Sequence, residues 1–381
     1  DGNIVILDYI NCNRDGPNGA SSFTLSGTIG GFSSATITTD SNASGGTGLE
    51  SISSIKYNAP RDYTAQDRAV TAEDYKVLVK TLYANAQSVQ VYGGEDAETP
   101  DYGKVYISIK AKSGSNLTVQ TKENLVTSLK QYAVASVTPV IIDPETTYIT
   151  LVVNFKYNSG ITAKDVTTLQ TNVLSKVATY NNNTLEDFTG MFRYSKLIEA
   201  INDADTSILS NITTLKMYKY FTPTLNAGTK YTISFNNALY NPHSGHNASG
   251  GGIISSTGFK INDDSSANEH FLDDDGEGIL RAYYLSGTTR VYTDSTYGTV
   301  NYTTGEVILT SAHLTSISNV DGAASTRVRV FAIPNSNDVV PVRNQILSID
   351  TSNSSITGEV DAIISGSSQA GTSYTTSSSY S

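Results

Sequence analysis

The chain has 381 residues, a net charge of −11 and one cysteine, Cys12, so an intramolecular disulfide and a zinc site built from cysteines are excluded. Only 16% of its residues are charged, below the usual level of about a quarter, and the excess of acid argues against duplex DNA or an anionic membrane as a partner. This length predicts two or three domains, and because the chain has no apolar run of about 18 residues, no transmembrane helix is expected.

Residues 1–57 read as short strands and turns, with strand patterns at 4–10, 22–29 and 34–40 and a last strand at 49–57. The N-terminus lacks the charged and apolar regions of a signal peptide and starts at once on the strand-like NIVILDYI. We therefore expect residues 1–57 to be a β-rich segment of a truncated domain, and the chain to be a fragment of something longer.

Residues 58–222 change character, beginning with a helix start at Thr71. Thr71 can cap this helix, Asp74 can reach back to complete a capping box, and Val70 can form a hydrophobic staple with Tyr75. The apolar side chains that follow recur with helical spacing and predict one buried face: Tyr75, Leu78, Val79 and Leu82.

A similar start recurs at residues 161–166, where Thr162 stands in the place of Thr71 and Asp165 in that of Asp74. Further helices are predicted at 121–134 and 193–202. Between them, apolar residues alternate along the predicted strands, most clearly in YITLVVNFKY. The order is β-α-β-β-α-β over about 50–142 and β-α-α-β over about 147–220, which indicates split βαβ units.

From residue 223 the helical patterns stop, and short strands separated by Gly, Asn and Asp turns predict an antiparallel β-sandwich or barrel over 223–340. The clearest hairpin is NYTTGEVIL. Residues 341–381 are predicted to hold C-terminal strands and a Ser/Thr-rich tail. The predicted fold class is α+β, with split βαβ-type units in the middle, an N-terminal β segment and a C-terminal antiparallel β-sandwich domain.

The sequence offers weak candidates for chemistry, and we predict no catalytic, cofactor-binding or metal-binding residues. The acidic run at 273–278 fails the EF-hand pattern, so an acidic β-turn in which Gly276 and Gly278 supply positive φ is favoured over an irregular cation site. His243 and His246 have the spacing of a metal pair but lack nearby further ligands. The acids between residues 95 and 101 lie in a Gly/Pro loop, where a solvated turn is favoured over a catalytic pair.

Several motifs in order resemble the baseplate J-like family of contractile-tail phage proteins, especially its larger T-even-type members. They are RAVT-x-x-DY from Arg68 to Tyr75, V-x-V-x-GG from Val89 to Gly94, P-x-Y-GKV from Pro100 to Val105, and FRYSKLIEA from Phe192. On the positions of this chain, the resemblance assigns a structural role to nine family-motif residues: Arg68, Thr71, Asp74, Tyr75, Gly94, Pro100, Gly103, Tyr194 and Ser195.

The resemblance implies a structural wedge component of the virion, assembled in the host cytoplasm, that self-associates as a dimer and a ring and binds other baseplate wedge proteins. The acidic charge and the absence of cofactor-binding motifs lead us to expect no cofactor, no nucleic acid and no membrane as partners. The alternative is a receptor- or carbohydrate-binding β module; the absence of Trp counts against it. We also expect Arg61, Asp62, Asp67 and Arg68 to form ion pairs that fix the loop before residue 71.

Overall fold

The computed structural model describes residues 48–97, 99–112, 116–247 and 252–361, and before them residues 16–24, 26–28, 30, 31, 43 and 46. The expected strands at 4–10 and 34–40 lie outside the described residues, and the described part of 22–29 forms no strand. The chain divides into two compact units, Asp1–Pro144 and Glu145–Ser381. This division passes through the predicted 58–222 region, and each unit is described by itself below.

The first unit begins with a helix, not with the strand predicted at 49–57. Helix α1 spans Ile52–Ala65, and Ser51 caps it by accepting a hydrogen bond from the Ser54 backbone N–H. It ends where Gln66 and Asp67 adopt left-handed conformations, with φ of 47° and 57°. The alternation of Ile and Ser favoured a strand, but a serine N-cap supplies a helix start that the pattern did not reveal.

Helix α2, Ala72–Leu82, starts as predicted. The Thr71 hydroxyl accepts from the Asp74 N–H at 3.3 Å, and the Asp74 carboxylate accepts from the Thr71 N–H at 2.8 Å, which completes the capping box. The helix buries Tyr75, Leu78 and Val79. Val70 remains 67% exposed, so it is not buried against Tyr75 as the predicted staple requires.

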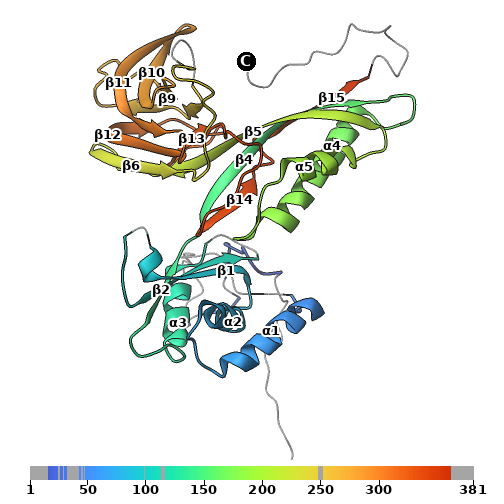
Figure 1. Cartoon of the computed structure of the whole chain (residues 1–381), viewed down its shortest axis with the longest axis vertical. Helices are drawn as coiled ribbons and strands as arrows, with labels where there is room; N and C mark the ends of the chain where they lie inside the picture. Colours follow the sequence, from blue (N-terminus) through green and yellow to red (C-terminus); the bar gives the residue numbers. More distant parts are fainter. Residues whose placement is uncertain are drawn as a thin grey trace, which may run out of the picture. The chain divides into compact units, whose positions relative to one another are not determined.

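A three-stranded sheet completes the first unit. Strands β1 (Ala86–Gly93) and β2 (Lys104–Ala111) are antiparallel, and β3 (Thr138–Ile142) lies parallel to β2 after the crossover through helix α3 (Val119–Leu129). Figure 1 shows α2 and α3 beside this sheet, and their apolar faces share one core with it. The predicted order thus holds after α1, which replaces the first strand.

The second unit contains the predicted β-α-α-β segment. Strands β4 (Glu145–Tyr157) and β5 (Ile208–Phe221) pair antiparallel, and the chain between them forms α4 (Val166–Tyr180), the π-helix η2 (Asn181–Leu185) and α5 (Tyr194–Asn202). The alternating residues of β4 are buried as predicted, namely Ile149, Leu151, Val153 and Phe155. Figure 1 shows α4 and α5 side by side along this strand pair.

Helix α4 begins later than its sequence pattern indicated. Asp165 is the N-cap and accepts from the Thr168 N–H at 3.2 Å, so the predicted start at Thr162 is wrong by one turn. Asp is as good an N-cap as Thr, and the shorter helix still buries Leu169, Val173 and Val177.

Strands from distant parts of the chain extend the β4–β5 pair into a six-stranded mixed sheet. On one edge, β14 (Gln345–Ile349) and β15 (Ser355–Val360) lie parallel to β4. Beyond β5, β13 (Val328–Ala332) and then β7 (Ile254–Ser256) continue the sheet with antiparallel pairing. This sheet therefore takes strands from three of the predicted segments.

The remaining strands form a separate antiparallel sheet, in which β12 also pairs with β11. They are β6 (Gly228–Ser234), β8 (Phe259–Ile261), β9 (His270–Asp274), β10 (Ile279–Ser286), β11 (Thr289–Asn301) and β12 (Glu306–Ile317). The β11–β12 pairing closes the path β11-β10-β9-β8-β12 into a ring, so of the two expected arrangements the strands adopt that of a barrel. The NYTTGEVIL hairpin and the α+β class are confirmed.

We predict that Thr71→Ala lowers the free energy of unfolding by about 1 kcal/mol, because the Asp74 N–H loses its partner at the start of α2. Denaturant unfolding measures this loss. Thr71→Ser should restore stability, and Thr127→Ala, at an exposed position of α3, is the matched control because it removes only the hydrogen bond from the Thr127 hydroxyl to the Glu123 carbonyl. Equal losses from both Thr→Ala variants would contradict the cap.

The stability of the fold at low pH should depend on Asp205. Its carboxylate accepts a hydrogen bond from Lys164 Nζ at 2.5 Å and also accepts from Ser207. These contacts, Lys164 first, lower the pKa of Asp205 from 3.8 to about 2. A lowered pKa stabilises the fold above the unfolded-state pKa and ceases to do so as the pH falls from about 4 to about 2. The melting temperatures of the wild type and Asp205→Asn should therefore differ at neutral pH and converge in this window, whereas a constant difference would exclude the linkage.

Candidate functional site

The motif glycines of the first unit shape the loop between β1 and β2. A Cβ at Gly94 would lie 1.8 Å from the Asp101 carbonyl oxygen, so no side chain fits there. The Asp101 N–H in turn donates to the Gly94 carbonyl at 2.9 Å. Gly103 has a φ of 79°, which favours glycine. Pro100 is exposed in the same loop, and these residues hold a backbone path without placing reactive groups together.

The ion pairs expected before Thr71 are absent from this described stretch. Arg61 belongs to α1, donates to the Tyr57 carbonyl at 2.6 Å and places its guanidinium 3.6 Å from the centroid of the Tyr57 ring. Asp62, Asp67 and Arg68 are exposed, and no ion pair joins any of the four. The prediction is wrong because the lead-in is a helix and a tight turn, which direct these side chains to solvent.

Tyr75 and Tyr194 both fix helices to the strands beside them. Tyr75 is buried, no described residue bonds its hydroxyl, and burial raises the pKa of that hydroxyl. The Tyr194 N–H donates to Asp338, which also pairs with Arg193 at 2.8 Å, and the Tyr194 hydroxyl donates to the Thr213 carbonyl of β5. Ser195 is exposed at the start of α5.

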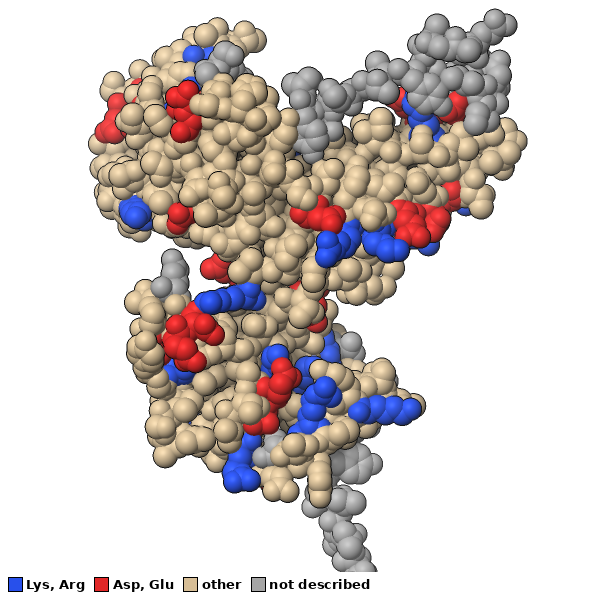
Figure 2. Space-filling model, in the orientation of Figure 1, with Lys and Arg blue, Asp and Glu red and all other residues tan. Residues whose placement is uncertain are grey.

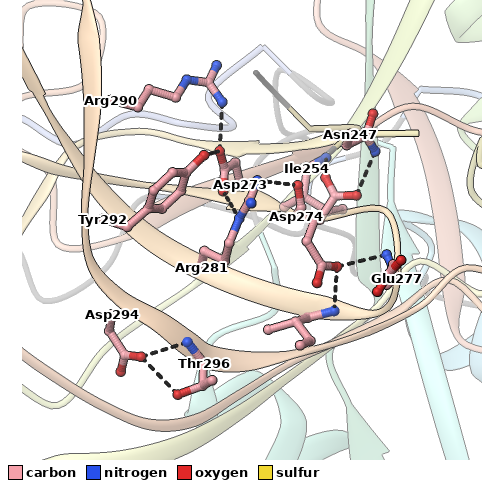
Figure 3. A network of polar contacts seen from close by, with 12 residues as sticks. Asn247, Ile254, Asp273, Asp274, Glu277, Arg281, Arg290, Tyr292, Asp294 and Thr296 are labelled. Atoms are coloured by element: carbon pink, nitrogen blue, oxygen red, sulfur yellow. Dashed lines mark hydrogen bonds and ion pairs between the residues drawn. The ribbon is translucent and has the colours of Figure 1, made fainter. Parts of the chain in front are cut away.

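The acidic run at 273–278, for which an acidic β-turn was predicted, also supplies a buried charge network in the barrel (Figure 3). Asp273 of β9 is 1% exposed, and its carboxylate accepts from Arg281 of β10 at 2.9 Å and from Arg290 of β11 at 2.7 Å. The Tyr292 hydroxyl donates to the same carboxylate at 2.9 Å. Burial, together with this bond, raises the pKa of Tyr292, so the hydroxyl remains a donor at neutral pH.

Asp274 is also fully buried and anchors the start of β7. It accepts from the Asn247 amide, from the Ile254 N–H at 2.8 Å and from the Tyr302 hydroxyl at 2.6 Å. Burial, together with this bond, raises the pKa of Tyr302. Gly252 passes so close that a Cβ there would lie 1.9 Å from the Asp274 carboxylate.

Asp275 closes the turn that follows β9. It accepts from the N–H groups of Glu277 and Ile279, and Gly276 and Gly278 have positive φ as predicted. The acidic-turn prediction is thus right for Asp275 and wrong for Asp273 and Asp274. N–H and O–H donors occupy all three carboxylates, and the described residues contain no group of three or more His, Cys, Asp or Glu placed to hold a metal ion.

One signal in the sequence could have revealed this network. If the residues before and after the turn at Gly276–Gly278 are both taken as strands, the turn pairs them as a hairpin. Arg281 then lies directly opposite Asp273, as it does in the β9–β10 pair. The network fixes the barrel's strands to one another. Because its carboxylates are buried and bonded, it is suited to stabilising structure and not to turnover.

The two histidines at 243 and 246 do meet, with His246 Nδ1 3.2 Å from His243 Nε2. His246 packs edge-on against the Tyr240 ring. No acid or third histidine joins them in the described part of the chain to complete a metal site.

A cluster of tyrosines and arginines lies on the mixed sheet that is built on β4 and β5. We call it the Tyr–Arg cluster: Tyr148, Tyr218, Tyr220, Arg327 and Arg329. The rings of Tyr148 and Tyr218 stack with centroids 4.9 Å apart. Arg329 bonds the Tyr220 hydroxyl at 2.8 Å and pairs with Asp321, and Arg327 is exposed above the Tyr220 ring. The cluster borders an open cavity of about 380 Å³, and its composition is typical of protein–protein contact surfaces.

Basic side chains do not gather into one patch on the face shown in Figure 2, where Lys and Arg are interspersed with Asp and Glu. None of the described helices is long and apolar enough to cross a membrane.

Comparison with known proteins supports the resemblance found in the motifs. Residues 71–142 match the family model of baseplate structural protein gp6, C-terminal domain I, and residues 145–220 match the model of C-terminal domain III. The chain is 29% identical over 266 residues to baseplate wedge protein gp6 of Enterobacteria phage T4, a match that covers 63% of this chain and 40% of that protein. The chain thus spans less than half the length of this relative.

A chain in the cryo-EM structure of the anti-feeding prophage baseplate is 13% identical, with a TM-score of 0.35, and the match covers 45% of this chain and 39% of that one. A likeness this slight carries no argument about the fold. The two domain matches and the T4 relative confirm the baseplate resemblance of residues 71–220.

We predict that Asp273→Ala lowers the free energy of unfolding by about 3–5 kcal/mol, because it leaves the buried guanidinium of Arg281 without its carboxylate. Guanidinium chloride unfolding of the purified chain measures the effect. Asp294→Ala, which removes a half-buried acid hydrogen-bonded to Thr296 in β11, is the control and should cost far less, because it leaves no buried charge without a partner. A near-neutral Asp273→Ala would contradict the structural role of the network.

Proposed function

We propose that this gp6-like baseplate protein is a structural subunit of the wedge in a contractile phage tail baseplate, that it self-associates as a dimer and a ring, and that it binds other wedge proteins. The observation that carries the proposal is the succession of two gp6 C-terminal domain matches over residues 71–220. Its place is then the virion, after assembly in the host cytoplasm.

The roles of the motif residues support a structural function over an enzymatic one. Thr71 and Asp74 cap a helix, Gly94 and Gly103 shape a turn, and Tyr194 holds α5 to β5. The ionisable groups that do converge, around Asp273, are buried in bonds to one another. Residues of this kind maintain the fold of the subunit, and an assembly subunit needs a defined fold so that its contact surfaces match those of its partners.

The acidic charge and the exposed surfaces fit protein partners, with neither nucleic acid nor membrane among them. A ring needs two different self-contacts, or one self-contact and one partner, to close around an axis. The accessible members of the Tyr–Arg cluster, Tyr148, Tyr220 and Arg327, supply one surface suited to a partner, since Tyr and Arg are enriched among residues that dominate binding energy. Contacts of this permanent kind bury about 2,000 Å² or more.

Immunogold labelling of isolated phage tails tests the structural assignment. An antibody raised against the purified chain should label the baseplate end of tails that carry this protein, whereas label confined to the host cell fraction or to tail fibres would refute it. A tail preparation from a phage without this chain is the control.

Sedimentation velocity of the purified chain tests self-association separately. We expect a concentration-dependent shift from monomer to dimer. If the contact is mainly apolar, the dissociation constant of the dimer should change little with salt concentration, because salt screens charges. A single monomeric species at every concentration would contradict self-association through this part of the protein.

A further inference from the structure

Helix α1 buries no side chain that the structure describes. Of its residues, Ser54 and Asn58 alone are half-buried, and the rest of the described side chains are exposed. The apolar core of the first unit, built by α2, α3 and β1–β3, includes no residue of α1. Figure 1 shows α1 on the outside of this unit, next to α2.

The polar side of α1 faces its own unit. Ser54 donates to Glu50 at 2.6 Å, and Asn58 donates to Ser54 at 3.0 Å. Together with Ile55, Ala59 and Asp62 of α1 and with residues of α2, they border a groove of about 460 Å³ between the two helices. An amphipathic helix normally turns its apolar side inward. On α1, Ile55 and Ala59 lie only at the edge of this groove, and Ile52 and Tyr63 lie outside it.

The apolar residues of α1 form a continuous stripe that is left to solvent. Ile52, Ile55, Ala59 and Tyr63 are spaced by three, four and four residues, so they share one side of the helix. Ile52 is 72%, Ile55 47% and Tyr63 80% exposed. Tyr57 projects from another side, where the Arg61 guanidinium covers its ring. We call the four residues the α1 stripe.

A helix of this kind requires a partner to be stable. Isolated helices shorter than about 12–15 residues are marginal in water, and α1, with 14 residues, also carries Pro60 in its interior, which weakens a helix further. Within its own unit, α1 gains little burial to offset these costs. The missing burial must come from a surface that covers the α1 stripe.

We propose that the α1 stripe docks against the same stripe of a second copy of this chain, with the two helices antiparallel across a two-fold axis. The proposal rests on the proposed self-association and names the surface that produces it. In this arrangement Ile52 of one copy packs against Tyr63 of the other, and Ile55 packs against Ala59, so the contact is self-complementary as a two-fold interface must be.

Charge permits a second copy as the occupant. Each copy carries a net charge of −11, which opposes association, so two copies must meet through a surface that places no acids against one another. The four residues of the α1 stripe are uncharged. A basic or polar partner would gain nothing from this stripe, whereas an identical apolar stripe gains burial on both sides.

The available area fits a specific but modest dimer. Three large apolar side chains with Leu49 beside them, which is also exposed, offer on the order of 100 Å² each, or about 400 Å² of apolar surface per copy. Since a little over half of a typical interface is apolar, the whole contact would bury roughly 1,400 Å² in total, within the standard range of specific interfaces. This is less than the about 2,000 Å² of a permanent contact, so the α1 stripe would be one part of the surface that holds the assembly together.

Disulfide trapping tests the proposal, because Cys12 is the only cysteine to remove. In a Cys12→Ser background, Ile52→Cys combined with Tyr63→Cys should give a covalent dimer on mild oxidation. The two positions lie about 16 Å apart along one helix, too far for a disulfide within a chain. Ser53→Cys combined with Thr64→Cys has the same spacing on a neighbouring side of α1 and is the matched control. Equal cross-linking of the two pairs, or none, would overturn the proposal.

Substitution of the stripe provides a second measurement. Ile52→Lys with Tyr63→Lys should weaken dimerisation at least tenfold in sedimentation velocity, while Lys176→Glu, which also changes charge but at an exposed position of α4, should not. An unchanged dimer in the stripe variant, with the circular dichroism of the wild type, would overturn the α1 contact. Baseplate labelling by antibody would then still support the structural function, so the two failures are distinguishable.

A variant that keeps Cys12 identifies the other possible occupant. If Ile52→Cys forms a bond to Cys12 within one chain, detected as a monomer whose mass has fallen by two hydrogens, the α1 stripe is covered by the chain's own N-terminal segment. That outcome excludes a second copy as the occupant.

Discussion

The antiparallel pairing of β4 and β5 is the constraint on which most of the second unit depends. Because side chains alternate along a strand, the ten paired positions from Tyr148 to Tyr157 fix which residues face α4 and α5. A slip by one residue would expose Leu151, Val153 and Phe155 together and bury Val152 and Asn154. The register also aligns the free edges of the pair, which receive β13 on one side and β14 and β15 on the other.

The buried charges of the barrel impose a second constraint, of a different kind. Burying Asp273 and Arg281 removes both from water, and an apolar pair of similar volume could be as stable. The pair instead specifies how the strands align, because Asp273 keeps its hydrogen bonds only when β9, β10 and β11 are aligned as observed. Strand β8 has only three residues and meets β9 through a single residue pair, so at this point of the ring polar contacts define the closure more than the length of pairing does.

The sequence predicted those parts of the fold whose signal is local and periodic. The capping box at Thr71 and the alternation in β4 were both readable, because each needs only residues a few positions apart. Three failures have physical reasons: Ser51 gave no periodic pattern to mark α1, Asp165 and Thr162 are both good N-caps, and the burial of Asp273 depends on Arg281 and Arg290 across a hairpin. Of the candidate site, Gly276 and Gly278 were predicted correctly, but the Tyr–Arg cluster was not found. Its members come from β4, β5, β13 and the residue just before β13, and the first and last of them, Tyr148 and Arg329, lie 181 positions apart in the chain.

The same distinction explains why the relationship to baseplate proteins can be recognised while the contacts cannot be read from the sequence. The motifs that carry it are caps, turns and close backbone approaches, such as Gly94 against Asp101, which tolerate few substitutions because the backbone itself forbids them. Contact surfaces obey a weaker rule, since any apolar side chain of suitable size can fill a place in a stripe. A residue such as Ile52 is then noticed only when the structure shows that the described residues leave it 72% exposed. In an assembly subunit, the apolar side chains that a helix leaves exposed therefore indicate a contact surface more directly than the motifs do.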